Sequence, residues 1–519
     1  MVRHGLFVFL VTFGVLAIPA WFYPLTGLKT NPISNIRAQD EAFYSSIALR
    51  MASDGEWLTP KFLGRFAFNK PPLGVWLPAL SVKVFGPNKM ALRLPSLLAA
   101  GATAVFLFLW LSHFHGPIVG WAGVFFLLSS YWFLVLGKVA MTDSLLLAFT
   151  MAGYYLLAID PGLEHNRHSV WFGALAGLAF MTKSIAALPL FLILAIVVPR
   201  NRKLPAMLIS AVTALTIAAP WHIYQLVVNQ RWFWAEYVLD EHLMWGTQPP
   251  VVQATSNFEF YFSHLARISP WLLLAAAAGV VPLLRSKGER TLPLAALGIT
   301  GCTLLAFQYQ NATYLLSVSA LLSVIAARSF SNYRIAIPGF CALFAVSQAI
   351  SVAWPLRQDP AIQAMEAYCA SGGASELVVV NPDDEFYGAV LPFRRVRYCF
   401  RMDSALARKS PLDFWNLGVI VSASDFGNLG EKLPGYQRNL KAMGLDSVEA
   451  VGTVIAVTDD DEIIKLIQSR PDIDFLVPTN WLNPELKFEH LRRRVSEKHT
   501  LLSSHEMDVR AFSRCGLLR

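Results

Sequence analysis

The chain has 519 residues, of which 55% are hydrophobic and 15% charged, and its mean hydropathy is +0.45. This composition excludes an ordinary soluble domain and indicates an integral membrane protein. The formal net charge of +8 does not call for a nucleic-acid partner, because much of the excess lies in loops expected on the cytoplasmic side, beside anionic lipids, and no nucleic-acid motif is present.

Apolar segments of membrane-spanning length recur through the first two thirds of the chain. They predict about 11 transmembrane helices. We place them at 5–23, 90–112, 117–136, 144–159, 169–182, 184–199, 205–221, 269–284, 292–308, 312–327 and 335–354. The segments at 169–182 and 184–199 are short enough to be one interrupted pair. The first segment follows Arg3 and His4, as in a signal peptide, but without a clean small-x-small cleavage site we expect a retained anchor.

Basic residues predict the orientation. With a cytoplasmic N-terminus, three short loops rich in Lys and Arg all face the cytoplasm, as the positive-inside rule requires. These residues are Arg200, Arg202, Lys203, Arg285, Lys287, Arg290, Arg328 and Arg334. Segments 24–88, 137–143 and 222–268 and everything after residue 355 are then expected outside.

After Trp354-Pro355 charges become frequent and spanning segments end. We therefore divide the chain into a transmembrane domain, 1–355, with extracytoplasmic loops 24–88 and 222–268, and a soluble extracytoplasmic α/β domain, 356–519. Its expected strands are 376–381, 396–400, 417–422 and 451–457, with helices at 361–369 and 462–469. A Cys369–Cys399 disulfide is possible in an oxidising compartment, and the sequence leaves this open.

The paired carboxylates Asp40 and Glu41 follow the first span, where acidic residues beside hydrocarbon suggest a site at the bilayer surface. The apolar positions of 40–51 recur with helical spacing, which predicts an amphipathic helix lying on the bilayer. The alternative is a charge pair that complements the dipole of that helix.

Basic residues near the outer surface are candidates for anion binding. Lys70 precedes Pro71-Pro72, which hold the backbone in one conformation and so aim the lysine; a snorkelling lysine is the alternative. Arg93 lies just inside the next helix. Lys183 interrupts an apolar stretch, where a lysine is costly unless it meets an anion or water.

Two further segments carry polar candidates. Lys138 and Asp143 lie in the segment 138–144, where the alternative is an ordinary helix cap formed at 142–144. The loop 222–268 carries Glu241 and His264 among many aromatic residues, and an interfacial aromatic belt explains most of that loop without chemistry.

Together these motifs resemble the GT-C glycosyltransferases that use polyprenyl-phosphate sugars, above all the lipid A aminoarabinose transferases and protein O-mannosyltransferases. The resemblance rests on Asp40-Glu41 and on segments 68–76, 91–96, 138–144, 182–184 and 310–316. It is good over 30–190 and patchy to 354. The chain departs from the pattern with Asn69 for glutamate, Lys138 for arginine, Ser184 for glycine, and Gln308 and Gln310 for a basic pair.

The resemblance implies a role for each candidate. Asp40 would be the general base, with Glu41 orienting it or the acceptor, and Asp143 would bind the acceptor or steady a basic residue. The donor phosphate would be held by Lys70, Arg93, Lys138 and Lys183. His264 and Glu241 would contact the acceptor. Relatives of this type can carry a metal, but a neutral amide at Asn69 is a poor ligand, so we expect no cofactor; a divalent metal is possible but not supported by these residues.

The leading hypothesis is therefore a multi-pass enzyme of the bacterial cytoplasmic membrane. It would move one sugar, with inversion, from undecaprenyl phosphate to a lipid, glycan or protein acceptor. A transporter or flippase of lipid-linked sugars is the alternative, although no internal repeat is evident. A membrane-anchored scaffold would leave Asp40, Lys70 and Asp143 without a joint purpose.

Overall fold

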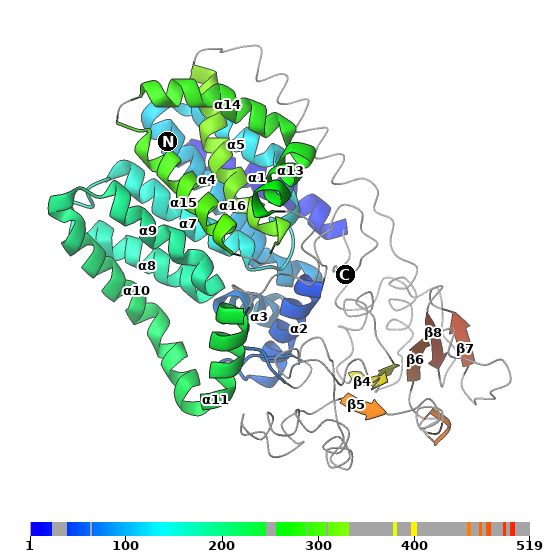
Figure 1. The fold of residues 1–519 in the computed structure, drawn as a ribbon. Coiled ribbons are helices and arrows are strands. Elements are labelled where there is room, and N and C mark those ends of the chain that lie inside the picture. Colours follow the sequence, from blue (N-terminus) through cyan, green and yellow to red (C-terminus); the bar gives the residue numbers. More distant parts are fainter. Residues whose placement is uncertain are drawn as a thin grey trace.

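The computed structural model describes two parts of the chain. In the first it covers residues 2–22, 39–62, 65–244, 256–286, 288–307 and 310–331. In the second it covers residues 377–380, 396–401, 454–457, 465, 467–469, 474–478, 491–494 and 499–503. The first part is helical and the second contributes strands (Figure 1).

Eleven described helices of the first part coincide with the expected apolar segments. They are α1 (Val2–Phe22), α4 (Lys89–His115), α5 (Pro117–Ser129), α6 (Tyr131–Leu136), α7 (Asp143–Ile159), α8 (Asn166–Lys183), α9 (Leu188–Val197), α10 (Arg200–Val228), α14 (Pro270–Arg285), α15 (Thr291–Ala306) and α16 (Leu315–Ala327). The expected segment 335–354 lies outside the described residues, so the total of about 11 spans stays a prediction.

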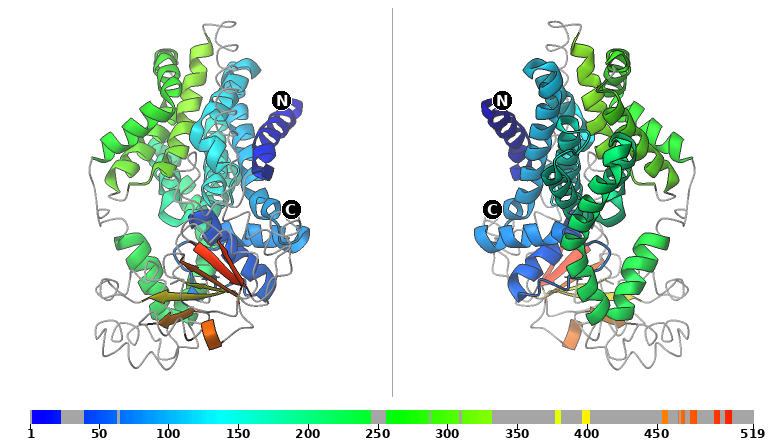
Figure 2. Two further views of the ribbon diagram at one scale, coloured as in Figure 1. Left: turned by 90° about the vertical axis from the view of Figure 1, so that its right-hand side faces the viewer. Right: turned by 90° about the vertical axis from the view of Figure 1, so that its left-hand side faces the viewer.

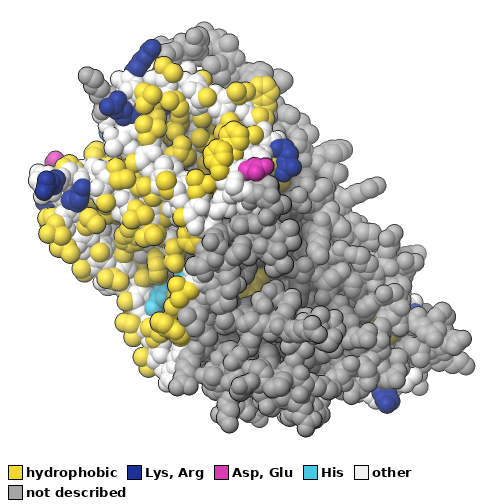
Figure 3. Space-filling view, viewed as in Figure 1, with side chains coloured by type: hydrophobic (Ala, Val, Ile, Leu, Met, Phe, Trp, Pro, Cys, Tyr) yellow, Lys and Arg dark blue, Asp and Glu magenta, His cyan; other side chains and the backbone are white. Residues whose placement is uncertain are grey.

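Several of these helices have the length and composition of membrane spans. Within the described residues five qualify, or six if α13 (Asn257–Ile268) and α14, bent by 101° to each other, form one broken span. The segments expected at 169–182 and 184–199 are α8 and α9, an interrupted helical stretch, Asn166–Val197, that counts as one of these five by length and composition. The interruption is at Ser184, whose φ of 47° ends α8. Hydrophobic side chains predominate on the helical face in Figure 3, as lipid contact requires.

Helices α4, α7 and α16 form the centre of the helical part, and their side chains are mostly buried. Close approach between neighbouring helices depends on small residues. Gly173 of α8 faces Ser210 of α10, and a Cβ added at Gly173 would lie 2.8 Å from the Ser210 Cα. The Ser210 hydroxyl also donates a 3.0 Å hydrogen bond to the Ser169 carbonyl. The α8–α10 contact therefore has no room for a side chain.

Replacing Gly173 with leucine is expected to lower the stability of the folded protein by about 1–3 kcal/mol, because the helices must separate. The matched control is Gly298→Leu in α15, where an added Cβ meets nothing within 4 Å. Thermal unfolding in detergent should show a lower melting temperature for Gly173→Leu only. Equal melting temperatures for the two variants would contradict this account of the packing.

The segment between α1 and α4 carries helices that lie across the ends of the spans. The expected helix at 40–51 is α2 (Gln39–Asp54), and α3 (Leu73–Phe85) follows a short hairpin of β1 (Lys61–Phe62) and β2 (Arg65–Phe66). The apolar face of α2, with Tyr44, Ile47, Ala48 and Met51, is buried in the main hydrophobic core with Val75 and Ala79 of α3. This face therefore packs on protein, and not on the bilayer as its periodicity suggested.

The strands of the second part form a mixed sheet of six strands in the described residues, ordered β5-β4-β3-β6-β8-β7. They are β3 (Leu377–Val380), β4 (Val396–Arg401), β5 (Val454–Val457), β6 (Asp474–Pro478), β7 (Leu491–Arg494) and β8 (His499–Ser503). Strands β3 to β6 are parallel, and β8 is antiparallel to β6 and β7. Three occupy expected positions. The expected segments 361–369 and 417–422 and Cys369 lie outside the described residues.

Figures 1 and 2 show the strands on the same side of the helical part as α2, α3 and α11 (Gln230–Phe233). The boundary of the second domain at residue 356 falls outside the described residues and stays a prediction.

Candidate functional site

Helices α7 and α8 bring an acid and a base together at one end of the bundle. Asp143 is the first residue of α7 and Lys183 is the last residue of α8. Because the two helices run antiparallel, these termini meet, and Lys183 Nζ donates to Asp143 Oδ1 at 2.7 Å. Their side chains are only 11% and 6% exposed. Thr142 is the N-cap residue of α7 and its side chain makes no capping hydrogen bond. The Asp143 carboxylate instead accepts the hydrogen bond from Lys183.

The same pair has further polar capacity. Within the described residues, Asp143 Oδ2 is buried and accepts no hydrogen bond. The Lys183 ammonium also lies 5.1 Å from the centroid of the Tyr314 ring, at cation–π distance. Tyr314 ends the short helix Ala312–Tyr314 before α16, and Thr313 beside it bonds to the Asn311 side chain. The carboxylate oxygen Asp143 Oδ2 therefore keeps the capacity to accept a further hydrogen bond.

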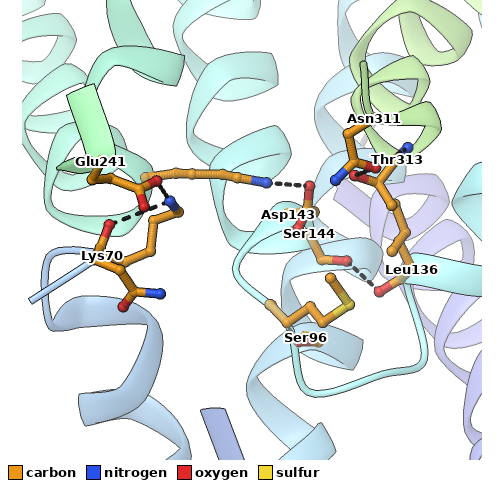
Figure 4. A network of polar contacts seen from close by, with 11 residues as sticks. Lys70, Ser96, Leu136, Asp143, Ser144, Glu241, Asn311 and Thr313 are labelled. Carbon is orange, nitrogen blue, oxygen red and sulfur yellow. Dashed lines mark hydrogen bonds and ion pairs between the residues drawn. The ribbon is translucent and has the colours of Figure 1, made fainter. Parts of the chain in front are cut away.

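A second ion pair joins Lys70 to Glu241. Lys70 follows Asn69 in the segment before α3, and Glu241 lies on the π-helix Trp234–Met244. The two side chains are 18% and 19% exposed. Figure 4 shows this pair on one side of Asp143, with Asn311 and Thr313 on the other. Two lysines expected to hold phosphate are thus both placed here, each against a carboxylate.

A third ion pair is fully buried. Arg93 Nε and Nη2 donate to the two oxygens of Glu41 at 2.7 and 2.8 Å, and Arg93 Nη1 donates to the Ala20 carbonyl at 2.7 Å. Glu41 Oε1 also accepts from the Ala140 amide at 2.9 Å. The exposed fractions of the two side chains are 0% and 1%. Arg93 is therefore held inside the protein by these contacts.

The loop 137–142 between α6 and α7 is anchored from several sides. Besides the Ala140 amide on Glu41, the Ser96 hydroxyl of α4 donates to the Met141 carbonyl at 3.1 Å. The Ser144 hydroxyl donates to the Leu136 carbonyl at 2.8 Å (Figure 4). These bonds set the start of α7, and with it the position of Asp143.

Lys138 lies in this loop and is buried. Burial and then the charge of Arg93 lower the pKa of Lys138 to about 7, although the Glu41 carboxylate acts in the opposite direction. An anion brought to this lysine would favour its charged form.

A chain of hydroxyl and imidazole groups lies next to Lys183. Ser184 Oγ is 3.0 Å from the Tyr237 hydroxyl, which is 2.8 Å from His222 Nε2. His222 Nδ1 is 2.8 Å from the Ala218 carbonyl on its own helix. Burial raises the pKa of Tyr237, and its hydrogen bond with Ser184 opposes this shift. Apart from the aromatic character of the loop, no sequence pattern predicted this series of hydrogen-bonded groups.

The remaining candidates are placed less fully. Asp40 is in the first turn of α2, directly before Glu41, and only its backbone is described. His264 of α13 contacts Phe260 of its own helix, through a 2.7 Å contact of Nδ1 with the Phe260 carbonyl and a ring contact at 4.3 Å. In the described part of the chain it is not among the contacts of Asp143 or Lys183. Tyr314 was missed as a site residue, although its motif is part of the resemblance.

The chain is similar in sequence to known proteins. The sequence model of the dolichyl-phosphate-mannose-protein mannosyltransferase family matches residues 69–224. The undecaprenyl phosphate-alpha-4-amino-4-deoxy-L-arabinose arabinosyl transferase of Shewanella sediminis is 28% identical over 380 residues, covering 68% of this chain and 67% of its own. The enzyme of the same name from Yersinia enterocolitica is 28% identical over 288 residues, covering 53% and 50%. The chain spans about half the length of the first relatives it matches, 43% and 50% in two cases.

The fold is also similar to that of solved structures. ArnT from Cupriavidus metallidurans, bound to undecaprenyl phosphate, superposes with a TM-score of 0.68 at 15% identity, covering 96% of this chain and 98% of that one. Its apo form gives a TM-score of 0.64. This likeness shows the fold, a polytopic helical membrane fold of the GT-C type. The resemblance predicted from the first-loop motifs is confirmed.

Proposed function

We propose, on the premise of this shared fold and resemblance, that the protein is a glycosyltransferase of the bacterial cytoplasmic membrane. It would transfer a monosaccharide from undecaprenyl phosphate to a lipid, glycan or protein acceptor outside the membrane, with inversion. The observation that carries the proposal is the grouping, at one end of the bundle, of two lysine–carboxylate pairs. Lys183 pairs with Asp143 and Lys70 with Glu241, and the expected orientation puts this end of the bundle on the outer side, where a lipid phosphate would lie.

The two lysines would bind the donor. Each is partly accessible and each is already neutralised by a carboxylate, so an approaching phosphate competes for the ammonium group instead of meeting an unpaired buried charge. As the phosphate leaves, its negative charge grows, and Lys183 and Lys70 would balance that charge. Tyr314 would keep Lys183 in place from the other side.

The reaction balances without a covalent enzyme intermediate. The Asp40 carboxylate would take the proton of the acceptor hydroxyl, and the hydroxyl oxygen would attack the anomeric carbon. The bond between that carbon and the phosphate oxygen breaks, and undecaprenyl phosphate leaves. Asp143 Oδ2, buried and without a described donor, would accept a hydrogen bond from the acceptor or from the sugar.

Glu41 and Arg93 would act as positioning residues. Their buried pair ties the first turn of α2 to α4, to the end of α1 and to the loop before α7. This would hold Asp40, the neighbour of Glu41, at a constant distance from Asp143. We assign Arg93 this role in preference to phosphate binding, because its guanidinium is wholly buried.

The activity is tested with purified protein in lipid, a panel of labelled undecaprenyl-phosphate sugars and a membrane extract as acceptor. Release of free undecaprenyl phosphate that needs the extract would support a transferase and identify the sugar. Binding or flipping of the donor without release, for every sugar tried, would favour the transporter alternative.

Replacing Lys183 with methionine is expected to weaken donor binding by roughly 10- to 100-fold, since a charge-assisted hydrogen bond to phosphate contributes about 1.5–3 kcal/mol. The measurement is equilibrium binding of the labelled donor to protein in nanodiscs. Lys203→Met is the matched control, because Lys203 lies at the opposite end of the bundle, where it donates to the Ala195 carbonyl.

The single variant leaves the Asp143 carboxylate buried without its partner, which could unfold the site. The double variant Lys183→Met/Asp143→Asn removes that charge as well and keeps the side-chain volumes. Donor affinity equal to the wild type in a folded double variant would refute the role of Lys183.

A further inference from the structure

A histidine–carboxylate cluster lies at the turn between α7 and α8, far from the site described above. Asp160, His165 and His168 each place one ligand atom so that all three lie within 4.8 Å of one another. Asp160 follows α7, which has 17 residues, so at 1.5 Å per residue the cluster lies about 25 Å along the helix from Asp143. By the expected orientation this turn faces the cytoplasm.

The two imidazoles converge on one carboxylate oxygen. His168 Nδ1 is 2.6 Å from Asp160 Oδ2, and His165 Nδ1 is 3.6 Å from the same oxygen. The two imidazole rings have centroids 5.3 Å apart and are tilted by 56°. A hydrogen bond that merely closes the turn needs one histidine. A hydrogen bond that only closes the turn does not explain why the Nδ1 of a second histidine faces the same oxygen.

The turn that carries these groups is held by independent contacts. Asp160 Oδ1 accepts from the Glu164 amide at 3.1 Å, and Leu163 is fully buried. Arg202 of α10 donates to the Leu163 and Glu164 carbonyls at 3.1 and 2.9 Å. The ligand atoms therefore sit on a preorganised frame, which lowers the cost of gathering them around an ion.

We propose that Asp160, His165 and His168 form a binding site for a divalent transition-metal ion of the zinc class. Two imidazole nitrogens and one carboxylate oxygen suit zinc, cobalt or nickel, whereas magnesium and calcium prefer all-oxygen sites. Ligands of a tetrahedral ion lie about 3.3 Å apart, from metal–ligand bonds of about 2.0–2.1 Å. The observed 2.6 and 3.6 Å separations bracket this distance.

The surroundings of the cluster determine the expected metal affinity and the access of water to the ion. The His165 side chain is 63% exposed, so water can fill the remaining coordination positions. The guanidinium of Arg202 and the N-terminal end of α8 add positive potential, which weakens cation binding. We therefore expect an affinity in the micromolar range, weaker than that of a closed structural zinc site.

The test is a titration of the purified full-length protein, carrying no polyhistidine tag, with Co²⁺ in the visible range, followed by displacement with Zn²⁺. The wild type is expected to bind one Co²⁺ per chain. His165→Ala is expected to weaken binding at least tenfold, and it should leave the fold intact because the side chain is largely exposed. His113→Ala is the matched control, since His113 is an exposed histidine at the end of α4, outside the cluster.

Two results would overturn the proposal: no saturable Co²⁺ binding by the wild type, or binding that is equal in the wild type and His165→Ala. Asp160→Asn is a second variant for the same Co²⁺ titration. It should also weaken Co²⁺ binding, because it keeps a hydrogen-bond acceptor for the turn but removes the charge that a metal needs. The readout is binding and not turnover, so the outcome is independent of the proposed transferase activity.

Discussion

Replacing Asp40 with asparagine is expected to lower turnover by a factor of roughly 10²–10⁴, with donor affinity nearly unchanged. The substitution removes a base but keeps the shape of the side chain, and the proposed ligands of the phosphate, Lys183 and Lys70, remain. The first turn of α2 also stays in position, because Glu41 is held by Arg93 and by the Ala140 amide. Release of free undecaprenyl phosphate and equilibrium binding of the donor measure the two quantities separately.

The matched control is Asp54→Asn, at the other end of the same helix. Asp54 forms an exposed ion pair with Arg50 at 3.0 Å, and we expect its loss to leave turnover unchanged. If Asp40→Asn retained turnover close to that of the wild type, Asp40 would not be the general base. If it lost donor binding to the same extent as turnover, its role would be in binding.

Replacing Arg93 with methionine is expected to destabilise the protein by about 3–5 kcal/mol, which is the usual cost of leaving a buried charge without its partner. The Glu41 carboxylate would lose both guanidinium donors and keep the hydrogen bond from the Ala140 amide. The Ala20 carbonyl would also lose the Arg93 donor. Thermal unfolding in detergent, with the yield of folded protein, measures the effect.

The double variant Glu41→Gln/Arg93→Met distinguishes two contributions to stability: the penalty for leaving the Glu41 charge without Arg93, and the stabilisation that the ion pair itself provides. Because neither position of the pair then carries a charge, the double variant should be more stable than Arg93→Met alone. Turnover should still fall in the folded double variant, since the first turn of α2 loses its tie to α4. A double variant with the turnover of the wild type would refute the positioning role of Glu41 and Arg93.

Helix positions in the first part could be predicted well from the sequence. A run of apolar residues is a local signal. It predicts a membrane helix whichever other helices lie next to it, because the lipid environment requires apolar side chains in every span. The helix at 40–51 was also predicted, and so were three strands of the sheet. The covering of α2 by α3 was not, because periodicity identifies an apolar face but not what buries it.

The sequence by itself determined which residues can carry charge at the membrane surface, and the resemblance of its first-loop motifs was enough to predict the fold. Only the tertiary structure decided how those charges pair. Glu41 and Arg93 are separated by 52 residues, and Asp143 and Lys183 by 40. Such pairs form only where packing brings two helix ends together, so composition and spacing cannot distinguish a partly exposed lysine from an arginine sealed in the core. The burial of Arg93, and the place of Lys183 beside Asp143 and Tyr314, follow from helix packing alone.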